Sequence, residues 1–167
     1  MGRIVPEKGE HYLIQAFKQL ETDKKLVIAG GASDTDDYMK QLKELASDNN
    51  RIIFTGFVQG ELLQELYSNA YVYVLPSDLE GMPLSLLEAM SFGNCCLTSD
   101  IPECTEVIGH HGFSFKKGNV EDLKEKLQEL CKQESTVQDY QEKASDYICR
   151  KYDWDVIVQK TLMLYQE

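Results

Sequence analysis

Short apolar runs alternate along most of the chain with segments whose apolar residues recur at helical spacing. The runs lie at 24–30, 51–56, 70–76 and 94–99, and each is closed by Gly, Pro or Ser. Runs of this kind are typical of strands that are buried on both faces. Helical spacing is found at 10–20, 36–46, 60–70 and 83–93. A last strand is predicted at 112–118.

This alternation predicts the fold class. Strands and helices that follow one another through short connections favour an α/β fold, a Rossmann-like doubly wound parallel sheet covered by helices on both faces. Beyond residue 118 the pattern becomes wholly helical, and we expect a helical C-terminal tail that packs at the periphery, with Trp154 anchoring its last helix. Ligands of such sheets bind beyond the carboxyl ends of the strands.

The N-terminal segment suggests what the chain lacks. Gly2 and Arg3 are typical of a loop that follows a strand, yet only Met1 precedes them. We therefore expect residues 1–167 to form a single domain that lacks its first strand.

Composition narrows the function classes. With 43% hydrophobic and 27% charged residues, the 167-residue chain is close to the globular average. The net charge of −11 argues against nonspecific nucleic-acid binding, so an anionic small ligand would need a local positive site.

No apolar run reaches the roughly 20 residues of a membrane helix, and the N-terminus lacks an apolar signal core, which makes a cytoplasmic location the default. The five cysteines are expected to be reduced and mostly buried.

The turn after the third predicted strand is a candidate anion site. It runs from Pro76 to Met82, and Pro83 suits the first position of the following helix. Unpaired backbone N–H groups at such a helix start attract anions. The candidate donors are those of Gly81, Met82, Leu84 and Ser85.

Two carboxylates flank this turn, with Glu80 ahead of the helix and Glu88 beyond its first turn. The helix dipole explains Glu88 poorly, because its effect fades within one turn. A hydrolase with paired carboxylates is possible, and so is a division of labour in which Glu80 contacts a sugar and Glu88 accepts from a ribose diol.

The N-terminal segment offers positive charge. Arg3 and Lys8, followed by Gly9 and a helix, would lie at the carboxyl end of the absent first strand. An Arg guanidinium grips phosphate oxygens through a planar fork, and Lys acts as a point charge. Two loops could thus face one ligand.

Together these motifs resemble a known family. "GRIVPEKGEHYLIQAF" is similar to the Gly-Arg-x4-Lys-Gly element, and "EGMPLSLLEAMSFG" to the Glu-x7-Glu element, of the retaining glycosyltransferases of family 4, the group-1 glycosyl transferases. The order of "LVIAGG", "IIFTGFV" and "AYVYVLPS" also matches, so the resemblance covers nearly the whole chain. Asn94 and Cys95 stand where the family commonly has small or proline residues, outside the assigned site.

The resemblance implies the C-terminal half of a GT-B enzyme, which binds the donor, a nucleotide-diphosphate sugar, without a metal or other cofactor. Arg3 and Lys8 would bind the diphosphate and stabilise the leaving group, and Glu80 would contact the transferred sugar. Glu88 would accept from the ribose. The remaining donor-binding residues it implies are Gly2, Phe57, Val58, Gly81, Met82, Pro83, Leu84 and Ser85.

The same resemblance implies partners. The donor would be a UDP-, GDP- or ADP-sugar, and the acceptor a glycan, a lipid or a small molecule held by the missing N-terminal domain. That domain would place the enzyme in the cytoplasm or at the inner face of a membrane. The isolated chain would therefore not transfer sugar.

Two alternatives stay open. A GT-B nucleotide-sugar epimerase would share the architecture, but the order of the two motifs favours a transferase. A noncatalytic nucleotide-binding module would keep the fold, yet the intact Arg3, Lys8, Glu80 and Glu88 argue against it. The adjacent His110 and His111 would point in different directions, which disfavours a metal site.

Overall fold

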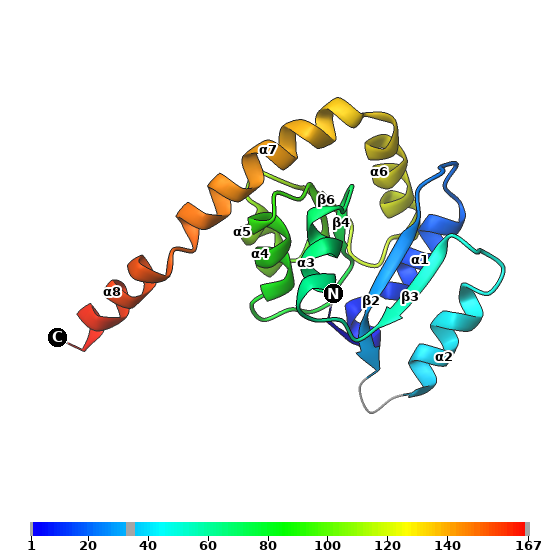
Figure 1. The fold of residues 1–167 in the computed structure, drawn as a ribbon, viewed down its shortest axis with the longest axis horizontal. Helices are drawn as coiled ribbons and strands as arrows, with labels where there is room; N and C mark the ends of the chain where they lie inside the picture. Colours follow the sequence, from blue (N-terminus) through cyan, green and yellow to red (C-terminus); the bar gives the residue numbers. More distant parts are fainter. Residues whose placement is uncertain (1, 33–35, 166–167) are drawn as a thin grey trace.

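The computed structural model describes residues 2–32 and 36–165, which form strands and helices in alternation (Figure 1). In chain order the elements are β1 (Gly2–Ile4), the 3-10 helix η1 (Pro6–Lys8), α1 (Glu10–Lys18), β2 (Leu26–Ala32), α2 (Asp36–Leu45), β3 (Ile52–Gly56), α3 (Glu61–Ser68), β4 (Tyr73–Leu75), α4 (Leu84–Ser91), β5 (Cys96–Ser99), α5 (Pro102–Ile108), β6 (Phe113–Phe115), α6 (Val120–Lys132), α7 (Glu134–Lys151) and α8 (Trp154–Leu164).

The strands of residues 2–32 and 36–165 form two parallel sheets of three strands each. In the first the order is β1-β2-β3, with Gly2 opposite Gly30, and in the second it is β4-β5-β6, with Val74 opposite Leu97. Every pairing is parallel, and each connection between paired strands contains a helix. The predicted Rossmann-like α/β architecture is therefore confirmed.

Each apolar run predicted as a strand overlaps an observed strand, although β2 extends two residues beyond its run. The prediction fails at the N-terminus, where Gly2 and Arg3 were expected in a loop but lie in β1, because they pair with Gly30 and Gly31 of β2. That a further strand precedes them remains a prediction. Helix α5 was not anticipated, although Pro102 at its first turn is a recognised start signal.

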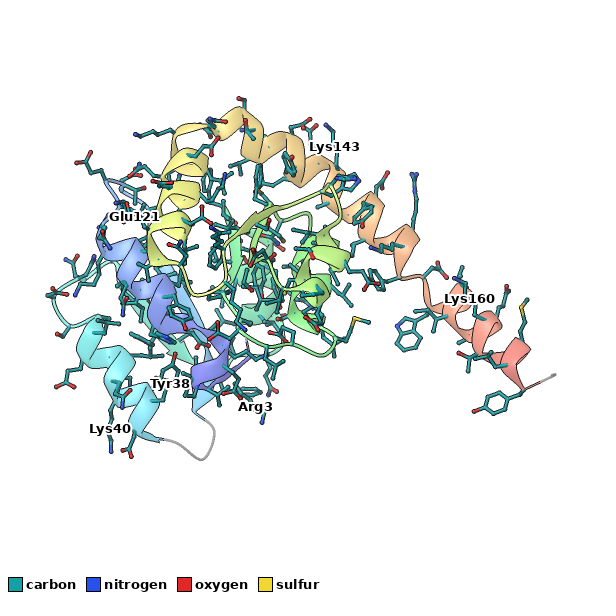
Figure 2. The ribbon with its side chains drawn as sticks, turned by 180° about the vertical axis from the view of Figure 1, so that it is seen from behind. Arg3, Tyr38, Lys40, Glu121, Lys143 and Lys160 are labelled. Atoms are coloured by element: carbon teal, nitrogen blue, oxygen red, sulfur yellow. The ribbon has the colours of Figure 1, made fainter. Side chains whose placement is uncertain are left out.

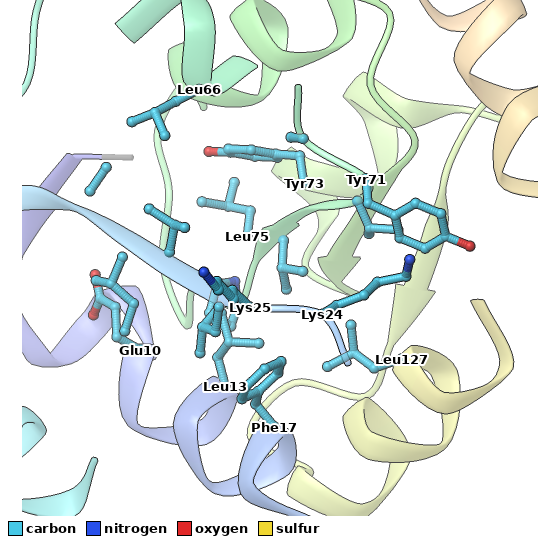
Figure 3. A pocket seen from close by; sticks show the side chains of 18 of the residues that line it. Glu10, Leu13, Phe17, Lys24, Lys25, Leu66, Tyr71, Tyr73, Leu75 and Leu127 are labelled. Carbon is cyan, nitrogen blue, oxygen red and sulfur yellow. The ribbon is translucent and has the colours of Figure 1, made fainter. Parts of the chain in front are cut away.

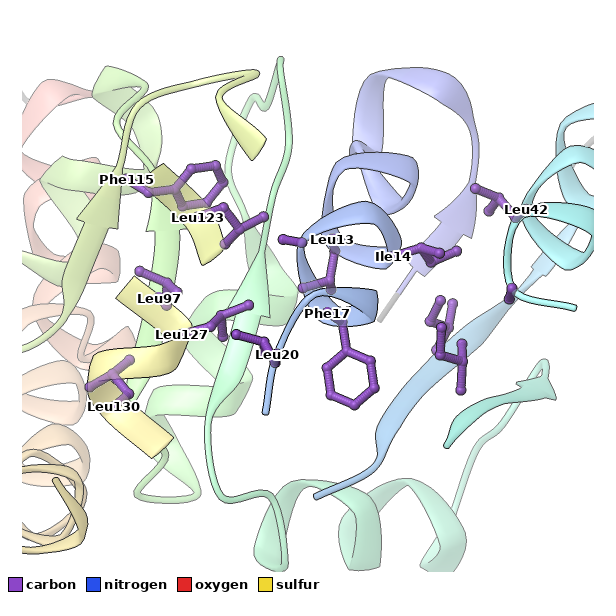
Figure 4. Packing of buried hydrophobic residues seen from close by; sticks show 14 of the residues in the cluster. Leu13, Ile14, Phe17, Leu20, Leu42, Leu97, Phe115, Leu123, Leu127 and Leu130 are labelled. Atoms are coloured by element: carbon purple, nitrogen blue, oxygen red, sulfur yellow. The ribbon is translucent and has the colours of Figure 1, made fainter. Parts of the chain in front are cut away.

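The tail is less peripheral than expected. Helix α6 packs on α1, where Leu123, Leu127 and Leu130 join the same buried cluster as Leu13 and Leu20 (Figure 4). Helix α7 packs on α4 and buries side chains of its own. The expectation of a peripheral tail is wrong for these two helices, because each presents an apolar stripe to the core.

Only the end of the tail leaves the body of the protein. Helix α8 extends away from it, with Lys160 in solvent (Figure 2), and none of its described residues is buried. Trp154 is 76% exposed, so the prediction that it anchors this helix is wrong. Asp153 starts the helix instead by accepting hydrogen bonds from the N–H groups of Asp155 and Val156.

The cysteines, the metal-ligating side chains and the helices were each compared with what a special site would require. Cys95, Cys96 and Cys104 are buried free thiols, whereas Cys149 is exposed. Among the side chains that the structure describes, no three His, Cys, Asp or Glu residues gather closely enough to hold a metal ion. Within residues 2–32 and 36–165, none of the helices has the length and apolar character that crossing a membrane requires.

Candidate functional site

Two loops meet where β1 and β4 end. The first runs from Val5 to Gly9 between β1 and α1, and the second from Pro76 to Pro83 between β4 and α4. The N–H of Asp78 donates to the carbonyl of Glu7 at 2.8 Å, which joins the two loops through their backbones. The carboxyl ends of these strands are where an α/β sheet binds its ligands.

Lys8 and Glu80 form an ion pair across this junction. Lys8 Nζ donates to Glu80 Oε1 at 2.7 Å, and the side chain of Glu80 is only 7% exposed. The same oxygen accepts from the hydroxyl of Ser77 at 2.6 Å, and Ser77 is fully buried. The carboxylate of Glu80 is thus held by two donors, and the ammonium of Lys8 is fixed at the surface of the junction.

Gly9 permits the close approach of the two loops. Its φ is +70°, and a Cβ at this position would lie 2.1 Å from the carbonyl oxygen of Pro76. Real Cβ atoms do not approach backbone so closely, and an L side chain rarely adopts this φ. The Gly that follows Lys8 in the sequence motif is therefore required by packing against the second loop.

A further contact supports the junction from α1. The hydroxyl of Tyr12 donates to Asp78 Oδ2 at 3.1 Å. Burial, together with the carboxylate of Asp78, raises the pKa of Tyr12, which keeps the hydroxyl protonated and able to donate. Asp78 is thereby bonded to α1 through its side chain and to the first loop through its backbone.

Arg3 is the free cation beside this junction. It lies in β1 and is exposed (Figure 2). In the part of the chain that the structure describes, its guanidinium forms no ion pair and no hydrogen bond. Arg3 therefore differs from Lys8, whose charge already has a partner, and its fork of donors is open to an anion.

The start of α4 keeps some of the predicted N–H donors. Within residues 36–165, the N–H groups of Gly81, Met82 and Ser85 have no hydrogen-bond partner. The prediction is wrong for Leu84, whose N–H donates to the carbonyl of Met82 at 2.9 Å. Pro83 is the N-cap rather than the first helical residue, and no side chain caps the helix. An anion site at this helix start thus has three open donors.

Glu88 lies apart from the ion pair, on the exposed side of α4. Its Oε2 accepts from the hydroxyl of Tyr67 at 3.0 Å. Burial raises the pKa of Tyr67, with Tyr73 and Glu88 adding to the effect, so this hydroxyl remains a donor. One carboxylate oxygen of Glu88 is therefore oriented by Tyr67, and the other is available to a ligand.

Tyr73 secures the strand beneath α4. It is buried, and its hydroxyl donates to Ser85 Oγ at 2.9 Å. The bond connects β4 to the first turn of α4 and fixes Ser85, one of the predicted donor-binding residues.

Several apolar side chains in the predicted donor-binding segments are exposed. Phe57, in the loop after β3, is 74% exposed, and Val58 beside it is half-buried. Leu79, Met82 and Leu84 are also exposed in the second loop and at the start of α4. Large apolar groups gathered around polar donors are typical of a surface that another molecule covers.

The structure brings only some predicted residues into contact. Lys8 joins Glu80 directly, and Arg3 lies on the same β1–α1 segment, but Glu88 contacts neither. The sequence pattern did not identify Ser77, Tyr12 or Tyr67 as supporting residues. Ser77 follows a predicted strand and precedes Glu80 by three positions, which is a usable signal, whereas Tyr12 and Asp78 are 66 positions apart and show none.

Comparison with protein families gives one clear result. The model of the family described as "Glycosyl transferases group 1" matches residues 1–147.

Individual relatives agree with this match. An uncharacterized glycosyltransferase of Methanocaldococcus jannaschii is 29% identical over 169 residues, covering 99% of this chain and 43% of the relative. The N,N'-diacetylbacillosaminyl-diphospho-undecaprenol alpha-1,3-N-acetylgalactosaminyltransferase of Campylobacter jejuni is 36% identical over 167 residues, covering 99% of this chain and 43% of the relative. The chain spans less than half the length of the curated relatives it matches.

Solved structures show the same fold. The crystal structure of Anabaena HepE in complex with UDP and glucose superposes with a TM-score of 0.89 at 21% identity, covering 99% of this chain and 47% of that one. At this identity the likeness concerns the fold alone. It agrees with the Rossmann-like half that the sequence predicted.

Proposed function

The chain belongs to the glycosyl transferases group 1, and we propose from this that it binds the nucleotide-diphosphate sugar of a glycosyl transfer reaction. The observation that carries the proposal is the junction of the two loops, where the Lys8–Glu80 pair, the open guanidinium of Arg3 and the free N–H groups of α4 lie at the carboxyl ends of parallel strands. A diphosphate and a sugar need this combination of positive charge, backbone donors and a carboxylate.

Arg3 and Lys8 would bind the diphosphate. Bond cleavage between sugar and phosphate leaves negative charge on the departing nucleotide, and two cations fixed beforehand stabilise that charge without reorganising. Lys8 is already oriented by Glu80, whereas Arg3 is free to close on the phosphates. Neither role requires a metal ion.

Glu80 would contact the transferred sugar. Its carboxylate is held by Lys8 and Ser77 through one oxygen, Oε1, which leaves Oε2 to accept from a sugar hydroxyl. Because Lys8 would bind the phosphate and Glu80 the sugar, their ion pair would position the two groups relative to each other.

The nucleoside would extend along α4. Glu88 would accept from the ribose hydroxyls through the oxygen that Tyr67 leaves open. Phe57 and Val58 would flank the nucleobase, since an exposed aromatic ring offers a stacking surface. Gly2, next to Arg3 in β1, would contact the donor through its backbone.

Backbone donors at the start of α4 would hold phosphate or sugar oxygens. Gly81, Met82 and Ser85 offer N–H groups, and Pro83 has none. Leu84 would contribute through its exposed side chain, because its N–H is bonded to the carbonyl of Met82.

Transfer itself would need more protein than these residues. We propose that the longer protein carries an N-terminal domain that binds the acceptor, a glycan, a lipid or a small molecule, and that the sugar is transferred with retention of configuration in a cleft of the GT-B type. The chain spans less than half of its curated relatives, which supports this division.

Calorimetric titration with UDP, GDP and ADP tests the proposal. One of the three should bind, and Arg3→Ala should weaken that binding at least tenfold, because Arg3 has no structural partner whose loss would disturb the fold. Lys40→Ala is the matched control, since Lys40 is an exposed cation on α2 whose ion-pair partner among the described residues is the exposed Asp37. Absence of binding at millimolar nucleotide, or equal weakening by both variants, would contradict donor binding.

A further inference from the structure

Ser99 is a buried polar residue behind the second loop. It is the last residue of β5 and is fully buried, although it carries a hydroxyl. A polar group in the core needs a hydrogen-bond partner, because burial without one costs free energy. The hydroxyl of Ser99 donates to the backbone carbonyl of Ser77 at 2.5 Å. The core of the second sheet is therefore bonded to the loop that carries Glu80.

This hydrogen bond lies just beyond the end of the strand ladder. β4 and β5 pair as far as Leu75, which is opposite Thr98. Pro76 follows Leu75 and has no N–H to donate to a neighbouring strand. The side chain of Ser99 then supplies a hydrogen bond to the main chain of Ser77. The start of the second loop is thus held to β5 by a side chain, past the last paired residues.

The peptide group between Ser77 and Asp78 is bonded at both of its polar ends. Its carbonyl accepts from Ser99, and its N–H donates to the carbonyl of Glu7 at 2.8 Å. A trans peptide group is planar, with its C=O and N–H pointing in opposite directions, so the two bonds together fix its orientation. Glu7 directly precedes Lys8 in the first loop. This one peptide group therefore connects β5 to the loop that carries Lys8.

Ser77 in turn orients Glu80. The hydroxyl of Ser77 donates to Glu80 Oε1 at 2.6 Å, and Lys8 Nζ donates to the same oxygen at 2.7 Å. Where the hydroxyl of Ser77 points depends on the backbone of Ser77, which the bond from Ser99 holds. Two consecutive hydrogen bonds thus run from Ser99 through Ser77 to the carboxylate of Glu80.

We propose that Ser99 is a positioning residue for the carboxylate that binds the transferred sugar. Ser99 contacts neither nucleotide nor sugar; it holds Ser77, and through Ser77 it keeps Glu80 in one rotamer beside Lys8. A carboxylate oriented before the ligand arrives binds it without reorganising. The proposal rests on the proposed function, in which Glu80 contacts the sugar. Loss of the Ser99 hydroxyl therefore weakens binding of the sugar and leaves binding of the nucleotide nearly unchanged.

Positioning must be separated from a merely structural role. Ser99→Ala removes the donor to a carbonyl in the core, so it lowers stability in either case. Thr98 offers the matched control, because it precedes Ser99 in β5, is equally buried and, in the part of the chain that the structure describes, has a hydroxyl without a hydrogen-bond partner. Successive side chains of a strand point to opposite faces, so Thr98 points away from Ser77. Thr98→Val should therefore leave Glu80 undisturbed.

The first measurement is made without ligand. Three-bond NMR couplings from Cγ of Glu80 to its backbone nitrogen and carbonyl carbon report its χ1 rotamer. The couplings should fit one staggered rotamer in the wild-type chain and in Thr98→Val, and should move toward averaged values in Ser99→Ala. Ser99→Thr restores the hydroxyl and should recover the wild-type values. If Ser99→Ala does not fold, Ser99→Cys replaces it, because Cys keeps the shape and is a weak donor.

Unchanged couplings in the variant that lacks the Ser99 hydroxyl would overturn the proposal. Equal changes in Thr98→Val would overturn it as well, because any disturbance of β5 would then act on Glu80.

The second measurement is calorimetry with UDP, GDP and ADP, each alone and as its glucose ester. For the nucleotide that binds, Ser99→Ala should weaken binding of the ester by about fivefold more than binding of the nucleotide, which is the size of one hydrogen bond. Equal weakening of both would overturn the proposal. Absence of binding by all of these ligands would contradict the proposed function, whereas the couplings of Glu80 would still decide whether Ser99 positions it.

Discussion

The junction of the two loops and the space between the two sheets differ in the residues that form them. At the carboxyl ends, the loops after β1 and β4 touch through the Lys8–Glu80 pair, the Asp78–Glu7 backbone bond and the contact of Gly9 with Pro76. Between β2 and β4 lies a pocket of about 580 Å³, the inter-sheet groove, which is lined by Leu26–Ala29 and residues 71–75 and reaches Lys8 and Pro76 of the two loops (Figure 3). The loop junction depends on particular polar groups and one Gly, whereas most of the residues that line the groove are apolar. Specific chemistry is therefore concentrated at the loops.

Substitution of Gly9 should break the loop junction most severely. Gly9→Ala should lower the free energy of unfolding by about 4 kcal/mol, because it combines overpacking against the carbonyl of Pro76 with a strained positive φ. Gly118→Ala is the matched control. Gly118 has a φ of +69°, but its Cβ would meet nothing nearer than 3.7 Å, so the cost should be about 1 kcal/mol. Denaturant unfolding measures both, and equal losses would show that the loops are not in tight contact.

The ionisation of Glu10 should make the free energy of unfolding depend on pH. Glu10 lines the inter-sheet groove. Burial raises the pKa of its carboxyl group to about 7, although a hydrogen bond from Tyr38 acts in the opposite direction. The folded state therefore holds a proton that the unfolded state releases between about pH 4.5 and 7. The contribution of Glu10 to the free energy of unfolding is complete below this pH range and is lost as the pH rises through it.

Glu10→Gln removes this titration. Relative to the wild-type chain, the variant should gain about 3 kcal/mol in free energy of unfolding between pH 4 and pH 8. Urea unfolding at a series of pH values measures the difference. A constant difference across the series would contradict the burial of an ionisable Glu10.

The ion pair should contribute a smaller amount. A double-mutant cycle with Lys8→Met and Glu80→Gln should give a coupling free energy of about 1 to 2 kcal/mol, because Glu80 is almost fully buried while Lys8 retains some contact with water. The same cycle at Lys40 and Asp37, an exposed pair on α2, should give less than about 0.5 kcal/mol. Similar coupling free energies for the two pairs would contradict a stronger ion pair at the loop junction than at the surface.

The fold was largely predictable because strands buried on both faces are contiguous apolar runs. β5, with all four residues buried, lies within such a run, and so does β2 except for its last residues. The tail was misjudged, since periodicity shows that α6 is amphipathic but not that its stripe meets Leu13 on α1. Trp154 shows the same limit, because the size of a side chain does not reveal whether a partner surface is there.

The candidate site was predictable as a set of residues but not as an arrangement. Local spacing singled out Glu80 and Glu88, the N-terminal segment offered Arg3 and Lys8 as positive charge, and the family resemblance supplied their expected roles. The pairing of Lys8 with Glu80 spans 72 positions and follows from the tertiary fold.

The donor at the start of α4 was partly misjudged for a more local reason. Pro83 precedes the helix as its N-cap, and the tight turn before it uses the N–H of Leu84. The sequence shows that a proline stands at the helix start but not whether it is the cap or the first helical residue.

The most direct test of the account is an amide NMR titration with UDP. If the loop junction binds the diphosphate, the signals of Gly81, Met82 and Ser85 should shift with UDP, while those of Val27 and Val74 in the inter-sheet groove should not. Arg3→Ala should reduce the shifts at equal UDP concentration. Shifts confined to Val27 and Val74, or no shifts at saturating UDP, GDP and ADP, would contradict the assignment of the nucleotide site to the loop junction.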